Sequence, residues 1–161
     1  MVARLASPTP LPDRPVGELA GLVHRVVRAS LHRLSPVLGE EGITMGQFWA
    51  LHFVSSRGGT SVGAVARTLG VSPPTACASL DQLEAAGLLR RTRSERDHRS
   101  VELSLTPRGG RAEARVWAEV GRLLADAATG LAASDLTATV RVLRAIERRM
   151  EPVAPRGVER P

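Results

Sequence analysis

The sequence has one cysteine, no lysine, no tyrosine and no long run of apolar residues. A lone cysteine, Cys77, cannot form a disulfide within the chain, so the fold does not depend on a disulfide framework. Residues 1–14 are rich in proline and lack the continuous apolar segment of a signal peptide or a membrane span. We therefore expect a cytoplasmic protein that is not embedded in a membrane.

Aromatic residues are also scarce: the chain has two phenylalanines and two tryptophans. Three of them, Phe48, Trp49 and Phe53, fall in one short segment with helical spacing. Proteins that bind RNA or single-stranded DNA stack bases on an exposed platform of aromatic side chains. The clustering of the aromatics in one helix argues against such a platform.

What the sequence has in excess is arginine. All 22 of its lysine-or-arginine residues are arginine, and the formal net charge is +6. A basic domain of this kind is typical of nucleic-acid binders, and 161 residues suffice for one domain with its own core. A basic membrane-surface protein would share the charge, and a GC-rich genome also favours arginine codons. Charge alone therefore does not decide the function.

The spacing of apolar residues predicts a mainly α-helical protein with a small β-hairpin. A first helix begins near residues 13–15 and stops or kinks at Ser35-Pro36. A second begins after Thr44, whose side chain forms a capping box with Gln47. A fifth helix runs from Pro107 to about residue 129, and a sixth, capped by Ser134, ends at Pro152.

Between these helices lies a helix-turn-helix pattern. Ser61 caps a third helix that ends at Gly70, and Ser72 caps a fourth helix that ends at Gly87. Two short helices joined by a turn of three to four residues that contains glycine are typical of this motif. Ala76, Leu80 and Leu83 are expected to face the core. Two strands follow, 88–92 and 101–105, joined by a highly charged loop, which predicts a winged helix-turn-helix.

The segment 43–111 resembles the multiple-antibiotic-resistance regulator (MarR) family of transcriptional regulators. The likeness is carried by residues 44–48 (TMGQF), by 65–72 with 83–90 (VARTLGVS and LEAAGLLR), and by 97–100 with 103–109 (DHRS and LSLTPRG). The resemblance implies a homodimer that binds a pseudo-palindromic double-stranded DNA operator, with repression as the expected mode. It also implies a helical dimerisation region (13–38 and 107–151) and a DNA-binding lobe (43–106). From their composition, residues 1–12 and 152–161 are expected to be flexible tails.

By this resemblance the fourth helix enters the major groove, where base edges are distinguishable. Family members usually carry polar or basic residues near its start, whereas this chain has Pro73, Pro74, Cys77 and Ala78. Thr75 and Gln82 remain as readers by hydrogen bonding, and the apolar residues can contact thymine methyl groups. Asp81 would be repelled by DNA unless an arginine pairs with it. Helix N-termini add phosphate contacts, so the predicted interface comprises Ser61, Ser72, Pro74, Thr75, Cys77, Ala78 and Gln82.

The charged loop completes the predicted interface. Arg99 matches the arginine that enters the minor groove in the family, and Asp97 matches the acid that orients it. Arg93 and Arg96 are expected to contact phosphates. The alternative for Asp97 and Arg99 is a solvated surface pair.

Many members of the family bind a small aromatic effector between the dimerisation helices and the DNA-binding lobe. By resemblance, His32, Trp49, His52, Phe53 and Trp117 are the candidates to line such a pocket, the alternative being an ordinary hydrophobic core. The four histidines lack zinc-ligand spacing, so we expect no metal and no cofactor. For Cys77 we favour a structural or groove-facing thiol over a redox sensor.

Other function classes fit the sequence less well. The sequence has no nucleophile elbow, phosphate-binding loop or dinucleotide-binding motif, so we expect no enzyme activity. A non-specific architectural DNA binder stays open because few side chains of the fourth helix form hydrogen bonds. A winged helix used only for protein interactions is the second alternative.

Overall fold

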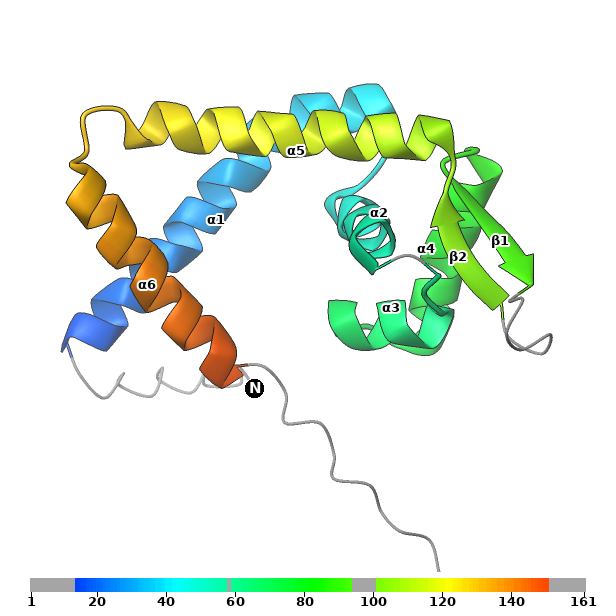
Figure 1. The fold of residues 1–161 in the computed structure, drawn as a ribbon, viewed down its shortest axis with the longest axis horizontal. Helices are drawn as coiled ribbons and strands as arrows, with labels where there is room; N and C mark the ends of the chain where they lie inside the picture. Colours follow the sequence, from blue (N-terminus) through cyan, green and yellow to red (C-terminus); the bar gives the residue numbers. More distant parts are fainter. Residues whose placement is uncertain (1–13, 58, 94–100, 151–161) are drawn as a thin grey trace, which may run out of the picture. The chain divides into compact units, whose positions relative to one another are not determined.

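The computed structural model describes residues 14–57, 59–93 and 101–150. It confirms the predicted fold class, a mainly α-helical chain with one antiparallel hairpin (Figure 1). The chain divides into two compact units, Met1–Arg122 and Leu123–Pro161. The elements in order are α1 (Arg14–Glu41), α2 (Met45–Arg57), α3 (Val62–Leu69), α4 (Pro73–Ala85), β1 (Leu89–Arg93), β2 (Val101–Leu105), α5 (Pro107–Ala128) and α6 (Ala133–Met150).

The first helix is longer than predicted, because α1 continues through Pro36 to Glu41. Proline has no N–H to donate to the carbonyl of the residue four before it, which is His32. The hydroxyl of Ser35 donates to that carbonyl instead, at 2.9 Å. Of the two alternatives expected at Ser35-Pro36, a stop or a kink, the stop was therefore wrong, since the neighbouring serine satisfies the acceptor that proline leaves unpaired.

The second helix begins as predicted. The side chain of Gln47 accepts from the backbone N–H of Thr44 at 2.8 Å, and the hydroxyl of Thr44 accepts from the N–H of Gln47 at 3.2 Å. This reciprocal pair is the predicted capping box. It directs one face of α2 into the core of the first unit, whose largest fully buried side chains are Phe48, Leu51, Val54, Val65, Leu80, Leu83, Leu88, Leu89, Leu103 and Val116.

The hairpin packs beside the helix-turn-helix. Its strands pair in antiparallel register from Leu89 opposite Leu105 to Arg93 opposite Val101. A further bridge joins Thr60, just before α3, to Leu103 of β2. The first strand starts one residue later than predicted because the N–H of Leu88 donates to the carbonyl of Leu83 at the end of α4.

The second unit contains the end of α5 and the whole of α6. Helix α6 starts at Ala133, so the predicted cap Ser134 lies inside its first turn; the N–H of Leu136 bonds to the carbonyl of Ala132 instead. None of the residues of α6 is buried. Its apolar positions are largely exposed, at 47% for both Val140 and Leu143. Nowhere in the described ranges is a helix long and apolar enough to span a membrane.

Candidate nucleic-acid interface

Local bonds form the turn between α3 and α4. Gly70 adopts the left-handed conformation (φ 64°) that ends α3, and the N–H of Val71 bonds to the carbonyl of Ala66. Ser72 then caps α4, with its hydroxyl oxygen 3.3 Å from the N–H of Thr75. Pro73 occupies the first turn of α4, where no backbone donor is needed. These short-range signals explain why the sequence predicts the motif correctly.

The fourth helix presents one face to the core and the opposite face to solvent. Ala76, Leu80 and Leu83 are at most 2% exposed, as predicted. The predicted DNA-contacting side chains of α4 are all exposed and lie on the outer face, and they are Pro74, Thr75, Cys77, Ala78 and Gln82. This outer face is therefore available to another molecule.

The two hydroxyls at the start of α4 are joined to each other. Ser72 and Thr75 share a hydrogen bond of 2.7 Å between their side-chain oxygens. At the start of α3, Ser61 is exposed and accepts from the N–H of Ala64 at 3.3 Å. Each serine therefore caps its helix while its hydroxyl remains at the surface, beside N–H groups that favour anions.

Asp81, on the outer face of α4, pairs with an arginine of β1. Arg91 donates to the carboxylate of Asp81 at 2.5 Å and to that of Glu84 at 3.0 Å. The hydrogen bond that Arg91 donates to Asp81 contributes most to raising the pKa of Arg91, opposed in part by desolvation, so this arginine stays charged. The sulfur of Cys77 lies within 4.0 Å of both charged groups. The arginine that Asp81 was expected to require is thus Arg91, a residue that the sequence reasoning did not single out.

Gln82 contacts a second residue that the sequence reasoning did not include in the interface. Gln47 of α2 is only 8% exposed and donates from its Nε2 to the Oε1 of Gln82 at 2.9 Å. In the sequence Gln47 had already been assigned to the capping box, and no local pattern signals a partner 35 positions away. Gln82, which the sequence predicts to contact DNA, therefore has one of its two polar side-chain atoms engaged by Gln47.

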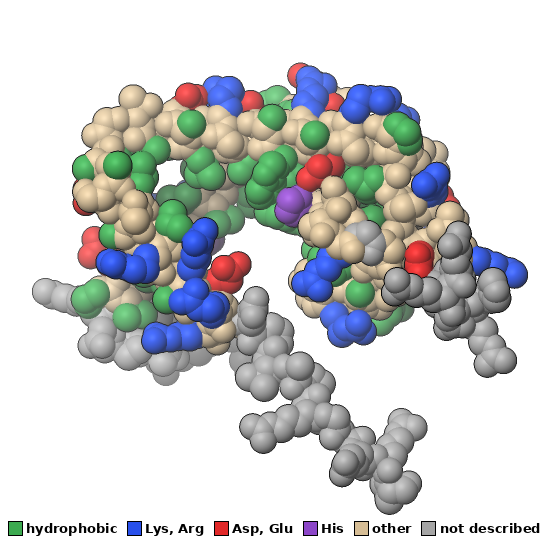
Figure 2. Space-filling model, in the orientation of Figure 1, with side chains coloured by type: hydrophobic (Ala, Val, Ile, Leu, Met, Phe, Trp, Pro, Cys, Tyr) green, Lys and Arg blue, Asp and Glu red, His purple; other side chains and the backbone are tan. Residues whose placement is uncertain are grey.

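The hairpin adds arginines to the same lobe. Arg93 is exposed and pairs with Val101 at the end of the ladder, and Arg90 donates to the hydroxyl of Ser104 at 2.8 Å. Figure 2 shows basic side chains on the surface over α3 and the hairpin. The other predicted wing contacts lie outside the described residues, and they are Arg96, Asp97 and Arg99.

A cleft of about 370 Å³ lies elsewhere in the first unit, where α2 meets α3. Of the residues predicted to bind an effector, Trp49, His52 and Phe53 line it. Trp49 is 43% exposed, and His52 and Phe53 are half-buried, so all three side chains reach the surface at the cleft. The remaining residues that line the cleft are Ser56, Thr68 and Leu69.

Trp117 of α5 joins the same cluster. Its indole stacks on the imidazole of His52, with ring centroids 4.5 Å apart and planes 14° apart. The Nδ1 of His52 lies 2.7 Å from a carboxylate oxygen of Glu113, one turn earlier in α5. These contacts fix the imidazole at the border of the cleft. His32 does not line this cleft; it lines a separate hollow on α1 with Arg25, Arg28 and Ala29.

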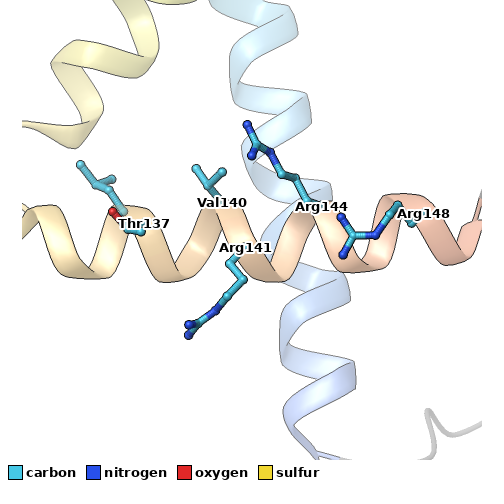
Figure 3. A pocket seen from close by; sticks show the side chains of 6 residues that line it. Thr137, Val140, Arg141, Arg144 and Arg148 are labelled. Atoms are coloured by element: carbon cyan, nitrogen blue, oxygen red, sulfur yellow. The ribbon is translucent and has the colours of Figure 1, made fainter.

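In the second unit, α6 carries a groove of about 490 Å³ with mixed apolar and basic lining. Figure 3 shows Val140 and Arg144 on one side of the helix and Arg141 extending to the other. The groove is thus lined by apolar side chains toward the start of the exposed helix and by arginines farther along it. The full lining is Leu136, Thr137, Val140, Arg141, Arg144 and Arg148.

Comparisons with known proteins agree with this architecture. Residues 41–100 match the sequence model of the MarR family. The HTH-type transcriptional repressor Rv2887 of Mycobacterium tuberculosis is 36% identical over 117 residues, which cover 70% of this chain and 82% of that protein. The chain belongs to the MarR family. It is therefore a helix-turn-helix regulator of transcription that binds DNA, as the resemblance predicted.

Solved structures of MarR proteins share the fold. A MarR family protein from Bacillus stearothermophilus superposes with a TM-score of 0.77 at 26% identity, over 88% of this chain and 99% of that one. Staphylococcus aureus MarR, in complex with salicylate and kanamycin, gives a TM-score of 0.76 at 23% identity, over 88% and 96% of the two chains.

Proposed function

We propose that this MarR protein is a repressor that binds a pseudo-palindromic operator as a homodimer, with α4 in the major groove. The observation that carries the proposal is the outer face of α4. It is exposed along its length, while the opposite face is buried and capping bonds define the start of the helix. An α-helix presented in this way fits the width of the major groove. Rv2887, the relative that is 36% identical to this chain, is named an HTH-type transcriptional repressor.

In this proposal the wing contacts the minor groove and the DNA backbone. Arg93 is exposed at the end of β1, directly before the segment that contains Arg96, Asp97 and Arg99. Arginine in a narrow minor groove reads groove width rather than base identity. Ser61, Ser72 and Thr75 would contact phosphates at the two helix N-termini. Such contacts fix the position of the protein on the duplex.

The homodimer is supported by apolar surface that each unit leaves exposed. On α1 the exposed side chains include Leu22, Val26 and Val27, at 45–55%. On α6 they include Val140 and Leu143. Contiguous apolar surface of this kind marks interaction sites. We propose that residues 13–38 and 107–151 form the dimerisation region, and that a two-fold axis brings two α4 helices onto successive turns of DNA.

We further propose that a small aromatic effector binds in the cleft lined by Trp49, His52 and Phe53. The aromatic walls and the imidazole fixed by Glu113 suit a planar ligand with a polar group. Staphylococcus aureus MarR, which has this fold, is found in complex with salicylate. Effector binding here would release the repressor from DNA.

The test is binding of the full chain to the DNA upstream of its own gene, followed by fluorescence anisotropy at several salt concentrations. We expect affinity at least about a thousandfold above scrambled DNA and a clear loss in Arg99→Ala. Arg111→Ala, which removes an exposed charge from α5, is the matched control and should bind as the wild type does. Equal affinity for both DNAs with a steep salt dependence would indicate an architectural binder. Absence of binding at low salt would favour a protein-interaction module.

A further inference from the structure

Gln82 is exposed on α4, but one end of its side-chain amide is occupied by Gln47 of α2, at 2.9 Å. An amide has an oxygen that accepts and an NH₂ group that donates. Which of the two faces outward decides which base edges Gln82 can recognise.

The orientation of both amides follows from one backbone group. The N–H of Thr44 bonds to Gln47 at 2.8 Å, and a backbone N–H can only donate, so the atom that it meets is the Oε1 of Gln47. The other end of Gln47 is then its NH₂ group, which only donates. The Gln82 atom that receives this bond must be Oε1. The capping box of α2 therefore determines the orientation of a side chain on α4.

We propose that Gln47 is a positioning residue that makes Gln82 prefer guanine at the base it meets. The proposal rests on the proposed function, in which α4 enters the major groove. A freely turning glutamine recognises adenine with two bonds, donating to N7 and accepting from the N6 amino group. Gln82, whose Oε1 is held by Gln47, presents its NH₂ group. Guanine offers two acceptors to that group, N7 and O6, whereas the amino groups of adenine and cytosine oppose it.

Gln82 lies where such a contact can form. Thr75, Ala78 and Gln82 are spaced by three and four positions, so they share one side of α4, and all three are exposed. Gln47 is 8% exposed and held at both ends, by Thr44 and by Gln82. The NH₂ group of Gln82 would thus have its orientation set before DNA binds. Binding would therefore cost little further side-chain entropy at this residue.

The experiment is selection of bound sequences from random double-stranded DNA by the full-length protein and three variants. For the wild type we expect guanine at one position in each half-site, favoured about threefold to tenfold over adenine, as one hydrogen bond would give. Gln82→Ala should lose the preference at that position and keep the others. Gln47→Glu should invert it. A glutamate preserves the capping box, but its second oxygen only accepts, so the Gln82 amide must turn and present Oε1 to adenine or cytosine.

Gln82→Glu tests the same effect of Gln47 on the side chain at position 82 without changing a buried residue. One of its oxygens accepts from Gln47 and the other faces DNA, so this position should change from guanine to cytosine. A thermal melt of each variant shows that it is folded. A common operator with no position dependent on Gln82, or adenine at that position in the wild type, would overturn the proposal and leave the DNA-binding function intact. No enriched sequence for the wild type would overturn the proposed function, and this inference with it.

Discussion

Gly109 in the first turn of α5 lies against the carbonyl group of Leu88, at the start of the hairpin. A Cβ added at residue 109 would stand 1.8 Å from the oxygen of Leu88, which is backbone and cannot move aside like a side chain. The same oxygen accepts from the N–H of Thr106 at 3.1 Å. The close approach therefore requires glycine for reasons of space.

Two more bonds from this region end on the carbonyls of the two residues that directly follow α4. The hydroxyl of Thr106 donates to the oxygen of Gly87 at 2.7 Å, and the guanidinium of Arg108 donates to the oxygen of Ala86 at 2.6 Å. A cation at the C-terminus of a helix also stabilises its dipole. The start of α5 is thereby bonded to the end of α4.

We predict that Gly109→Ala destabilises the protein by about 3 kcal/mol, because the added methyl group forces two backbones apart. Gly110→Ala is the matched control. The space next to Gly110 is open, so alanine there should stabilise α5 by about 0.5–1 kcal/mol. Urea unfolding followed by circular dichroism, at one protein concentration, measures both. If the two substitutions changed the free energy of unfolding equally, the contact with Leu88 would not be what restricts position 109 to glycine.

The sequence predicts the helix-turn-helix well because its signals are local. Ser72 with Thr75, Thr44 with Gln47, and Gly70 each act within a few residues of the chain, and the structure confirms the elements that they predict. The continuation of α1 through Pro36 was missed because a serine hydroxyl replaced the expected backbone bond. The bond from the Ser35 hydroxyl is also local. However, the low helix propensity of proline indicates the end of a helix more strongly than a neighbouring serine indicates its continuation.

The partners of the interface residues could not be predicted in this way. Gln47 reaches Gln82 and Arg91 reaches Asp81 only after α2, α4 and β1 have packed together. A charge argument indicated that Asp81 needs an arginine, but several arginines were available. To identify Arg91 as the partner, one must know how the hairpin packs against α4. That arrangement depends on tertiary packing rather than on the spacing of residues in the sequence.

Arg91 should matter for DNA binding although its guanidinium points to carboxylates. Arg91→Met removes the guanidinium that neutralises Asp81 and Glu84 beside a polyanion, and we expect the operator affinity to fall about tenfold at low salt. Folding stability should change by less, about 1 kcal/mol, because the pairs are partly exposed. Anisotropy titrations and thermal melts separate the two effects. Arg91→Met combined with Asp81→Asn should regain most of the affinity; a double variant as weak as the single one would argue against charge repulsion.

The cleft between α2 and α3 predicts a fluorescence response to small aromatic acids. Trp49 lines the cleft, whereas Trp117 stacks on His52. We expect salicylate to quench tryptophan emission, Trp49→Phe to lose the quenching and Trp117→Phe to retain it. Phe53→Ala removes an aromatic wall and should weaken salicylate binding about tenfold. Quenching that persists in Trp49→Phe would indicate a ligand site elsewhere in the protein.

The exposed apolar face of α6 predicts that the dimer depends on this helix. Val140 is 47% exposed, and a carboxylate there would be buried in a dimer interface without a partner. Val140→Asp should therefore convert the dimer to a monomer at micromolar concentration, as measured by sedimentation equilibrium. Arg149→Asp is the control, since nine residues at 100° per residue bring position 149 to the opposite side of the helix. If both variants dissociated equally, the change in net charge rather than the loss of an apolar contact would explain the result. If both remained dimers, another surface would join the subunits.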